Sequence, residues 1–255
     1  MLTPIERKVE LLRRLGPELE VIVKPFTPEL ARNTPDEFVS GVLVEELFAK
    51  VVIVGENFRF GHDRKGDLGV LRQLGAKYGF EVRAEQLVGD EEGLFSSTRA
   101  RDALERGDLA GVTRCLGRPH AISGTVIKGA QRGRSLGFPT ANLTSVREAI
   151  PPYGVYACLV DRVDESGAKA LARGVMNLGV RPTLDAGYSA EVHLLDYEAD
   201  LYGASLRLHL VERLRAEQRF PNLEALVDQI GRDAATARTL LESASPDPRA
   251  NGGWA

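Results

Sequence analysis

Apolar positions in the first half of the chain alternate between helical and strand spacing. Thr3 and Thr34 each begin a capping-box sequence with proline at the first helical position, so each predicts the start of a helix. Short apolar runs predict strands over 20–23 and 51–54, the latter buried, and an alternating pattern predicts a strand over 80–84. Helices and strands in alternation are typical of a parallel sheet with crossover helices. We therefore predict an α/β domain over residues 1–117.

The period of the pattern changes beyond Arg118-Pro119, where proline ends the preceding helical segment. Alternating polar and apolar residues then predict a series of strands, over 121–127, 154–160, 174–178, 190–195 and 205–210. Several short strands separated by turn signals suggest a small closed barrel. A last helix is expected after Pro221-Asn222, and the tail 245–255, rich in Pro, Gly and Asn, is expected to be disordered. The second domain is thus predicted to be a β-barrel with a C-terminal helix over 118–244.

The composition narrows the functional classes without selecting one. Hydrophobic residues make up 43% of the 255 residues and charged residues 27%, which is typical of a soluble globular protein. The formal net charge of −3 argues against a nucleic-acid partner, because such a partner calls for a strongly basic surface. No apolar run approaches the roughly 18 residues of a membrane span, and no apolar secretion segment stands at the N-terminus. With Cys115 and Cys158 as isolated thiols, these features predict a cytoplasmic protein and leave its oligomeric state open.

Two segments of the first half combine glycine, hydroxyl and arginine residues. The run VGENFRFG from Val54 to Gly61 follows a predicted strand at the end where α/β sheets bind ligands. The run SSTRAR from Ser96 to Arg101 begins a predicted helix with hydroxyls and two arginines, a combination that suits a phosphate group. An ordinary turn and an ordinary helix cap explain the same residues, so the patterns alone leave both interpretations open.

The segment 124–142, GTVIKGAQRGRSLGFPTAN, concentrates glycines and cations more than any other part of the second half. Glycine lets backbone N–H groups approach an anion closely, and Lys128, Arg132 and Arg134 can neutralise phosphate charge. Thr140 and Asn142 carry hard oxygen donors of the kind that suit Mg²⁺ bound to phosphates. The spacing is not that of a Walker P-loop. A glycine-rich hairpin with a solvated basic rim is the alternative interpretation.

These motifs resemble those of the bacterial bifunctional riboflavin kinase/FMN adenylyltransferases, a family also called FAD synthetases. The resemblance implies an incomplete Rossmann-like nucleotidyltransferase parallel sheet, followed by a small closed β-barrel of the flavokinase type and a C-terminal helix. It also implies a Mg²⁺-dependent riboflavin kinase, which moves the γ-phosphate of ATP to the 5′-hydroxyl of riboflavin and releases FMN and ADP. Further motif matches complete the order, over 152–156, 177–183, 191–196 and 200–203.

The resemblance implies roles for individual residues. Glu191 takes the place of the catalytic carboxylate, expected to act as general base toward the riboflavin hydroxyl, and Thr140 and Asn142 take the places of the Mg-ATP ligands. The ATP-binding positions are Gly124, Lys128, Gly129, Arg132, Gly133, Arg134, Gly137, Pro139, Thr140 and Asn142, and those on the flavin side are Asn177, Arg181 and Thr183. The adenylyltransferase positions are Gly55, Phe58, Arg59, Ser96, Ser97, Thr98, Arg99 and Arg101. Tyr202 is expected to serve packing.

The first half departs from the family pattern in one respect. The family's first strand and its His-x-Gly-His loop, which holds the ATP phosphates, have no counterpart in this sequence, whose histidines stand at 62, 120, 193 and 209. We therefore expect an incomplete parallel sheet and riboflavin kinase activity without adenylyl transfer. Two alternatives stay open: a bifunctional enzyme that also converts FMN to FAD, and a non-catalytic protein that binds flavin or nucleotide.

Overall fold

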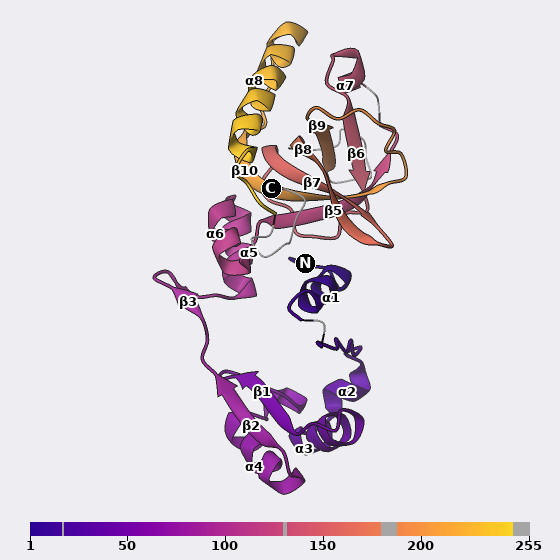
Figure 1. Cartoon of the computed structure of the whole chain (residues 1–255). Coiled ribbons are helices and arrows are strands. Elements are labelled where there is room, and N and C mark those ends of the chain that lie inside the picture. Colours follow the sequence, from indigo (N-terminus) through magenta and orange to yellow (C-terminus); the bar gives the residue numbers. More distant parts are fainter. Residues whose placement is uncertain (17, 130–131, 180–187, 247–255) are drawn as a thin grey trace. The chain divides into compact units, whose positions relative to one another are not determined.

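The computed structural model describes residues 1–16, 18–129, 132–179 and 188–246, which form two compact units (Figure 1). The larger unit comprises Met1–Leu11 and Ser96–Ala255, and the smaller unit comprises Leu12–Phe95. Each unit encloses a hydrophobic core of its own. Both parts of the predicted fold, the barrel with its C-terminal helix and the small parallel sheet, are confirmed.

A closed antiparallel β-barrel forms the centre of the larger unit (Figure 1). Its strands follow one another around the barrel in the order β10-β5-β6-β9-β8-β7. Their bounds are β5 His120–Ile127, β6 Thr140–Thr144, β7 Gly154–Asp164, β8 Gly167–Gly179, β9 Ser189–Leu194 and β10 Ser205–Ala216. Closure pairs β10 with β7, so that no edge of this sheet exposes unpaired backbone groups to another chain.

The alternation of side chains along each strand separates an inner from an outer face. Met176, Leu178 and Val192 point into the barrel and are fully buried. Their neighbours Val175 and Val155 point outward and belong to a second apolar cluster on the barrel wall. This two-residue period is the pattern from which the strands were predicted.

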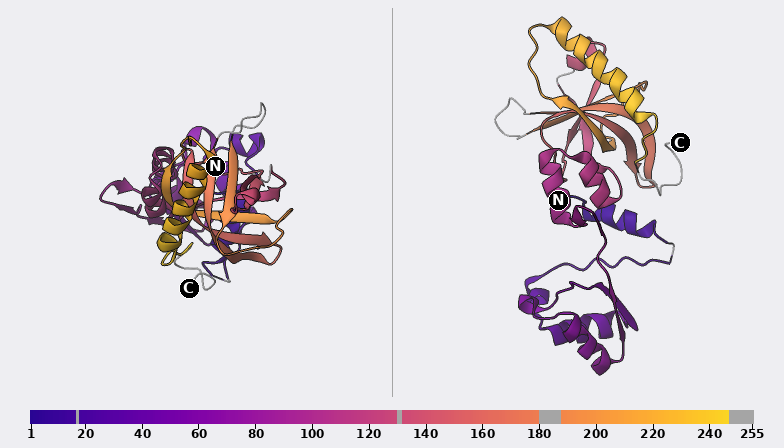
Figure 2. Two further views of the ribbon diagram at one scale, coloured as in Figure 1. Left: turned by 90° about the horizontal axis from the view of Figure 1, so that it is seen from above. Right: turned by 90° about the vertical axis from the view of Figure 1, so that its left-hand side faces the viewer.

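The outward apolar cluster is covered by α8, Leu223–Leu241. Asn222 caps the helix by accepting a hydrogen bond from the backbone of Ala225 at 2.8 Å. Ala234, Ala237 and Leu241 then pack on the wall, and Arg215 of β10 forms an ion pair with Asp233 of α8 at 2.8 Å. The right-hand view of Figure 2 shows α8 in yellow lying along the barrel.

Three further helices belong to the barrel unit, although the sequence placed them in the first domain. They are α5 Ser97–Arg106, α6 Leu109–Leu116 and α1 Ile5–Arg13, the last of these up to Leu11. Ala100, Leu104 and Val112 are buried in the same core as the inner barrel residues, and so is Leu2 near the N-terminus. The division between the units therefore lies at 11/12 and 95/96 rather than at the expected boundary after residue 117.

The smaller unit contains a parallel two-stranded sheet and its crossover helix. Its elements are α2 Pro28–Arg32, α3 Pro35–Phe38, the π-helix η1 Val39–Glu46, β1 Val51–Gly55, the 3₁₀ turn η2 His62–Arg64, α4 Leu68–Tyr78, β2 Glu81–Glu85, β3 Gly89–Asp90 and β4 Gly93–Leu94. β1 and β2 pair in parallel. Val39, Phe60, Leu71 and Phe80 form the buried core between sheet and helices.

The predicted strand over 20–23 does not form. In the described part of the chain the parallel sheet consists of β1 and β2, which leaves this segment without a strand to pair with. Ile22 and Val23 are accordingly more than half exposed, at 56% and 54%. The tail expected to be disordered lies, from 247 on, outside the described residues.

None of the helices that the structure describes combines the length and the hydrophobicity needed to cross a membrane.

The inner face of the barrel should dominate the stability of the larger unit. Leu208 of β10 is fully buried in the core, so Leu208→Ala is expected to lower the free energy of unfolding by about 2–5 kcal/mol. Leu223, which is 59% exposed at the start of α8, supplies the matched control, and Leu223→Ala should change that free energy by no more than about 0.5 kcal/mol. Urea unfolding of both variants measures the difference, and equal losses would contradict the assignment of the core.

Acid should destabilise the barrel unit through His120. Burial, assisted by the nearby Arg118 cation, lowers the pKa of His120 from 6.5 to about 4, while its ring nitrogen Nε2 is held 2.7 Å from the carbonyl oxygen of Ala149. Between these pH values the unfolded chain binds a proton that the folded chain does not, so the free energy of unfolding falls as the pH falls.

The slope from this single group is at most about 1.4 kcal/mol per pH unit. His120→Gln keeps a donor near the position of Nε2 and removes the titration, so its unfolding free energy should depend less steeply on pH. Urea unfolding at several pH values between 7 and 4 compares the two proteins. Parallel curves would show that His120 is not the group that titrates.

Candidate functional site

Polar side chains form a row across three adjacent strands on the outer face of the barrel. Asn142 of β6 stands opposite Glu191 of β9, and Glu191 stands opposite Asn177 of β8. Residues directly opposite one another on neighbouring strands share one face of a sheet. The residues next to them in sequence, among them Leu143, Val192 and Leu178, are buried inside the barrel. The row therefore consists of outward-facing oxygen and amide groups.

Thr140 extends this row toward the beginning of β6. It lies two residues before Asn142 and therefore on the same face. Its hydroxyl donates a long hydrogen bond to Oε2 of Glu191 at 3.5 Å. The strand thus brings two hard oxygen donors next to one carboxylate, although β6 itself was not among the strands that the sequence predicted.

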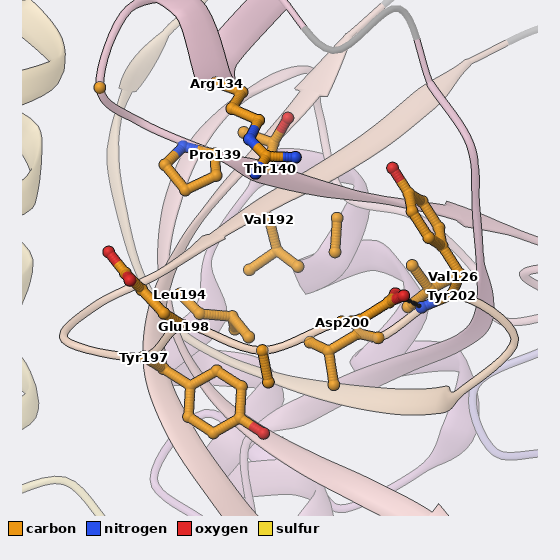
Figure 3. Close-up of a pocket in the computed structure, with 14 residues that line it drawn as sticks. Val126, Arg134, Pro139, Thr140, Val192, Leu194, Tyr197, Glu198, Asp200 and Tyr202 are labelled. Carbon is orange, nitrogen blue, oxygen red and sulfur yellow. Dashed lines mark hydrogen bonds between the residues drawn. The ribbon is translucent and has the colours of Figure 1, made fainter.

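A pocket of about 720 Å³ lies on the other side of β6. Its floor is apolar and includes inner barrel residues, namely Val126, Ala141, Val192, Leu194 and Leu201. Its polar rim consists of Arg134, Thr140, Tyr197, Glu198, Asp200 and Tyr202. Figure 3 shows Arg134 and Thr140 along the top of the pocket, with Tyr197, Glu198 and Asp200 below. Thr140 therefore belongs both to the pocket and to the outward polar row.

Glycines let the loop between β5 and β6 fold closely over the start of β6. A Cβ atom at Gly129 would lie 2.3 Å from Nδ2 of Asn142, so only glycine leaves room for that amide. A Cβ atom at Gly133 would lie 2.4 Å from the carbonyl oxygen of Phe138. Gly137 has a φ of +83°, in the left-handed region that favours glycine. The helix α7, Arg132–Ser135, lies inside this loop and presents the exposed Arg134 to the pocket.

Three contacts hold the rim of the pocket in place. The Lys128 ammonium lies 5.8 Å from the centre of the Tyr202 ring, at the limit of a cation–π contact, and so connects the glycine-rich loop to the segment 197–202. His193 stands opposite Thr140 and donates from Nδ1 to the carbonyl oxygen of Pro139 at 2.8 Å. Its ring also meets the Phe138 ring edge-on, with centroids 5.4 Å apart.

The structure brings together most of the residues that the resemblance assigned to the kinase. Thr140, Asn142, Asn177 and Glu191 share the outer row, and Arg134, Gly137 and Pro139 line the pocket. Arg181 and Thr183 lie outside the described residues, as does the side chain of Arg132.

Gly124 does not reach this pocket. It lies within β5 and lines a separate cavity of about 290 Å³ on the α1 side of the barrel. A Cβ atom there would lie 2.6 Å from the carbonyl oxygen of Thr144 on the neighbouring strand. Close approach of two strands therefore accounts for this glycine without a nucleotide.

The residues assigned to the adenylyltransferase fall into both units. Gly55, Phe58 and Arg59 belong to the smaller unit, where Phe58 stacks on Phe60 with ring centroids 5.4 Å apart. The segment from Ser96 to Arg101, which includes Ser97, Thr98 and Arg99, belongs to the barrel unit. There Ser96 caps α5 by accepting a hydrogen bond from the backbone of Arg99 at 3.1 Å. The alternative of an ordinary helix cap thus describes what Ser96 does.

Sequence reasoning matched residues 200–203 to a family motif but gave no role in the site to the segment that closes the lower rim of the pocket. Tyr202 was expected to pack, but it is 49% exposed and lines the pocket together with Tyr197, Glu198 and Asp200. The available signal was the run DYEAD over 196–200, which begins shortly after the end of β9. A run of this kind directly after a strand is a common place for ligand contacts, because loops at strand ends carry function.

Comparison with known proteins matches the two halves of the chain to two family models. A family model described as riboflavin kinase matches residues 116–241, and one described as FAD synthetase matches residues 1–99. The bifunctional riboflavin kinase/FMN adenylyltransferase of Escherichia coli K12 is 40% identical over 247 residues, which cover 96% of this chain and 77% of that protein. The chain belongs to this family. The expected family membership is therefore confirmed.

Further relatives agree with this assignment. The bifunctional riboflavin kinase/FMN adenylyltransferase of Pseudomonas fluorescens is 41% identical over 222 residues, covering 86% of this chain and 70% of that protein. A solved structure titled macrolide-efflux protein from Streptococcus pneumoniae superposes with a TM-score of 0.79 and 32% identity, covering 93% of this chain and 75% of that one.

Proposed function

We propose that the barrel unit is a riboflavin kinase that transfers the γ-phosphate of ATP across the start of β6. ATP would occupy the pocket, and riboflavin would lie along the outward polar row with its 5′-hydroxyl at Glu191. The observation that carries this arrangement is the position of Thr140, which lines the pocket and also hydrogen-bonds Glu191. A phosphate held at Thr140 would be within reach of an acceptor on the other side of the strand.

The pocket has the chemical character that a nucleotide needs. Its apolar floor, including Val192 and Leu194, suits a flat base, and its volume of about 720 Å³ falls within the range of small-molecule sites. Arg134 brings a positive charge to the rim beside Thr140, where the phosphates of ATP would lie. Backbone N–H groups of the glycine-rich loop add uncharged donors to phosphate oxygens.

The residues present fit a Mg²⁺ ion. The Thr140 hydroxyl and the Asn142 amide oxygen are hard donors on one face, and Gly129 leaves the space that the Asn142 amide fills. In the described part of the chain no group of three or more His, Cys, Asp or Glu side chains could hold a metal by itself. This agrees with an ion that takes most of its ligands from phosphates and water, as Mg²⁺ commonly does. When bound, such an ion would neutralise the charge of the phosphates.

Glu191 would act as the general base. The oxygen of the riboflavin 5′-hydroxyl would form a bond to the γ-phosphorus, the bond from that phosphorus to the β–γ bridging oxygen would break, and the hydroxyl proton would pass to the carboxylate. ADP would leave with the bridging oxygen. The hydrogen bond from Thr140 orients the carboxylate, and its partners across the sheet, Asn142 and Asn177, define where the acceptor can lie.

Transfer of an adenylyl group to FMN is a second candidate function. The specific observation in its favour is the match of residues 1–99 to the FAD synthetase model, since FMN is the product of the first reaction. This activity would use residues of the first half rather than the barrel site.

One incubation tests both functions. The purified chain is mixed with riboflavin, ATP and Mg²⁺, and the flavins are separated by chromatography over time. Formation of FMN without FAD supports the kinase alone, and FMN followed by FAD supports the bifunctional enzyme. If no FMN forms, the chain is instead a flavin or nucleotide binder, and the proposed function is wrong.

Removal of the proposed base should abolish turnover while leaving the substrates bound. Glu191→Gln keeps the size of the side chain and removes the charge that accepts the proton, so kcat is expected to fall by about 10²-fold or more. Riboflavin binding, followed by quenching of its fluorescence, should change little. The matched control is Glu212→Gln on the exposed surface of β10, which should keep full activity. Wild-type kcat in the Glu191 variant would eliminate this residue as the base.

A methyl group at Gly129 should displace the side chain of Asn142, whose amide oxygen is a proposed ligand of Mg²⁺. The Cβ atom of Gly129→Ala would meet the Asn142 amide at 2.3–2.7 Å, so the amide has to move. We expect about a tenfold or greater loss in kcat/KM for Mg-ATP, measured from initial rates of FMN formation. Gly231 in α8 has no atom within 4 Å of an added Cβ, so Gly231→Ala provides a control that should keep its activity. Equal kinetics in the two variants would exclude Asn142 from the site.

A further inference from the structure

The helix α1 lies on the barrel with a charged face rather than an apolar one. Among its residues, all of which the structure describes, Arg7 is the one that is buried. Ile5 and Leu12, which share the apolar side of the helix, are 45% and 38% exposed. By contrast, α8 covers another part of the barrel wall with apolar side chains. The two helices are therefore attached to the same barrel by different physical interactions.

Four charged side chains, Arg7, Glu10, Asp161 and Arg207, form an ionic cluster where α1 meets the barrel. Glu10 accepts hydrogen bonds from Arg207 of β10 at 2.8 and 3.3 Å, and it also forms an ion pair with Arg7. Arg207 stands opposite Asp161 of β7 in the pairing of the two strands. Although Arg207 is on the outer face of the barrel, it is only 5% exposed, because α1 lies against it.

A neutral histidine lies next to the ionic cluster. Nε2 of His209 in β10 is 2.8 Å from Oδ2 of Asp161. Burial lowers the pKa of His209, and the Arg7 and Arg207 cations lower it further, against the opposing effect of Asp161. The imidazole is therefore uncharged at pH 7, and the cluster balances two cations with two carboxylates. Loss of the Glu10 charge would leave an excess of one buried positive charge.

An attachment of this kind has a docked and a released state of similar free energy. The attraction between buried charges is offset by the cost of removing those charges from water, and release returns them to water. The nine residues of α1 are also too few for a stable isolated helix, so a released α1 loses its helical hydrogen bonds. Leu2, which is buried in the barrel core, adds one apolar contact just before the helix.

We propose that α1 is a strap, which the ionic cluster holds on the barrel and which opens while the rest of the barrel unit stays folded. The chain passes between the two units after Leu11 and again before Ser96. A docked α1 therefore gives the smaller unit two connections to the barrel unit, and release of residues 1–11 leaves the one before Ser96. The pocket and the outward polar row consist of other residues, so this inference does not rest on the proposed function.

Hydrogen exchange of the full chain, measured by mass spectrometry without substrates, tests the strap. Glu10→Gln is expected to raise the exchange rate of the α1 amides by about 30-fold or more, because docking then buries an unbalanced charge. The amides of α8 should keep their wild-type rates. A parallel rise in α8 would show that the whole barrel unit opens, and it would overturn the proposal.

Glu6→Gln is the matched control, because it removes a second carboxylate from the same helix. Glu6 forms an ion pair with Arg147 at 3.0 Å, but both side chains are more than 60% exposed. An exposed pair contributes little to stability, so the α1 amides should exchange less than about fivefold faster than in the wild type. Equal increases in the Glu6 and Glu10 variants would contradict the role of the ionic cluster.

A double-mutant cycle makes the test specific to the buried contact. Arg207→Met removes the cation that Glu10 binds and keeps an extended side chain at this position. In that background Glu10→Gln should no longer accelerate exchange, because the loss of both charges restores the balance of the cluster. Thermal unfolding verifies that each variant is folded. The same acceleration in both backgrounds would overturn the assignment of Glu10 and Arg207 to one ionic cluster.

Discussion

The whole site depends on the register of β6, β9 and β8 in the closed barrel. Because side chains alternate with a period of two, the pairing of Asn142, Glu191 and Asn177 puts all three on the outer face. A slip of one residue would turn them inward and bring apolar neighbours such as Val192 into water. Burial of the inner residues therefore fixes the register, and the register fixes the polar row. The packing of the barrel core therefore determines where the polar side chains of the site lie.

Much of this could be predicted from the sequence because the signals are local. The alternating strands, the helix after Asn222 and the run from Gly124 to Asn142 each carry their pattern within a few residues. β6 was the exception, since Thr140 and Asn142 were interpreted as metal ligands and no strand was predicted over its five residues. Their strand character appears only when β5 and β9 lie on either side.

The predictions that failed depend on contacts between distant segments. The apolar run at 20–23 has strand character but no partner in the described sheet, and a strand without a partner leaves its backbone groups unsatisfied. The compact units also divide at other positions than the predicted domains, because helical spacing alone does not show which core a helix joins. Leu104 and Val112 join the barrel, and nothing in their local spacing indicates this.

The position of Thr140 at the first residue of β6 has a consequence for the chemistry. A strand in the middle of a barrel separates the inside from the outside, because its neighbours close the wall on both sides. At the end of the strand the wall stops, and a side chain there can contact groups on both sides of it. Thr140 does so, because it lines the pocket and hydrogen-bonds Glu191 of the outward polar row. Donor and acceptor can then bind on opposite faces and meet only at the strand's end, where His193 holds Pro139 in place. In the proposed arrangement, the wall of the barrel would thus keep the two substrates apart everywhere except at the point of transfer.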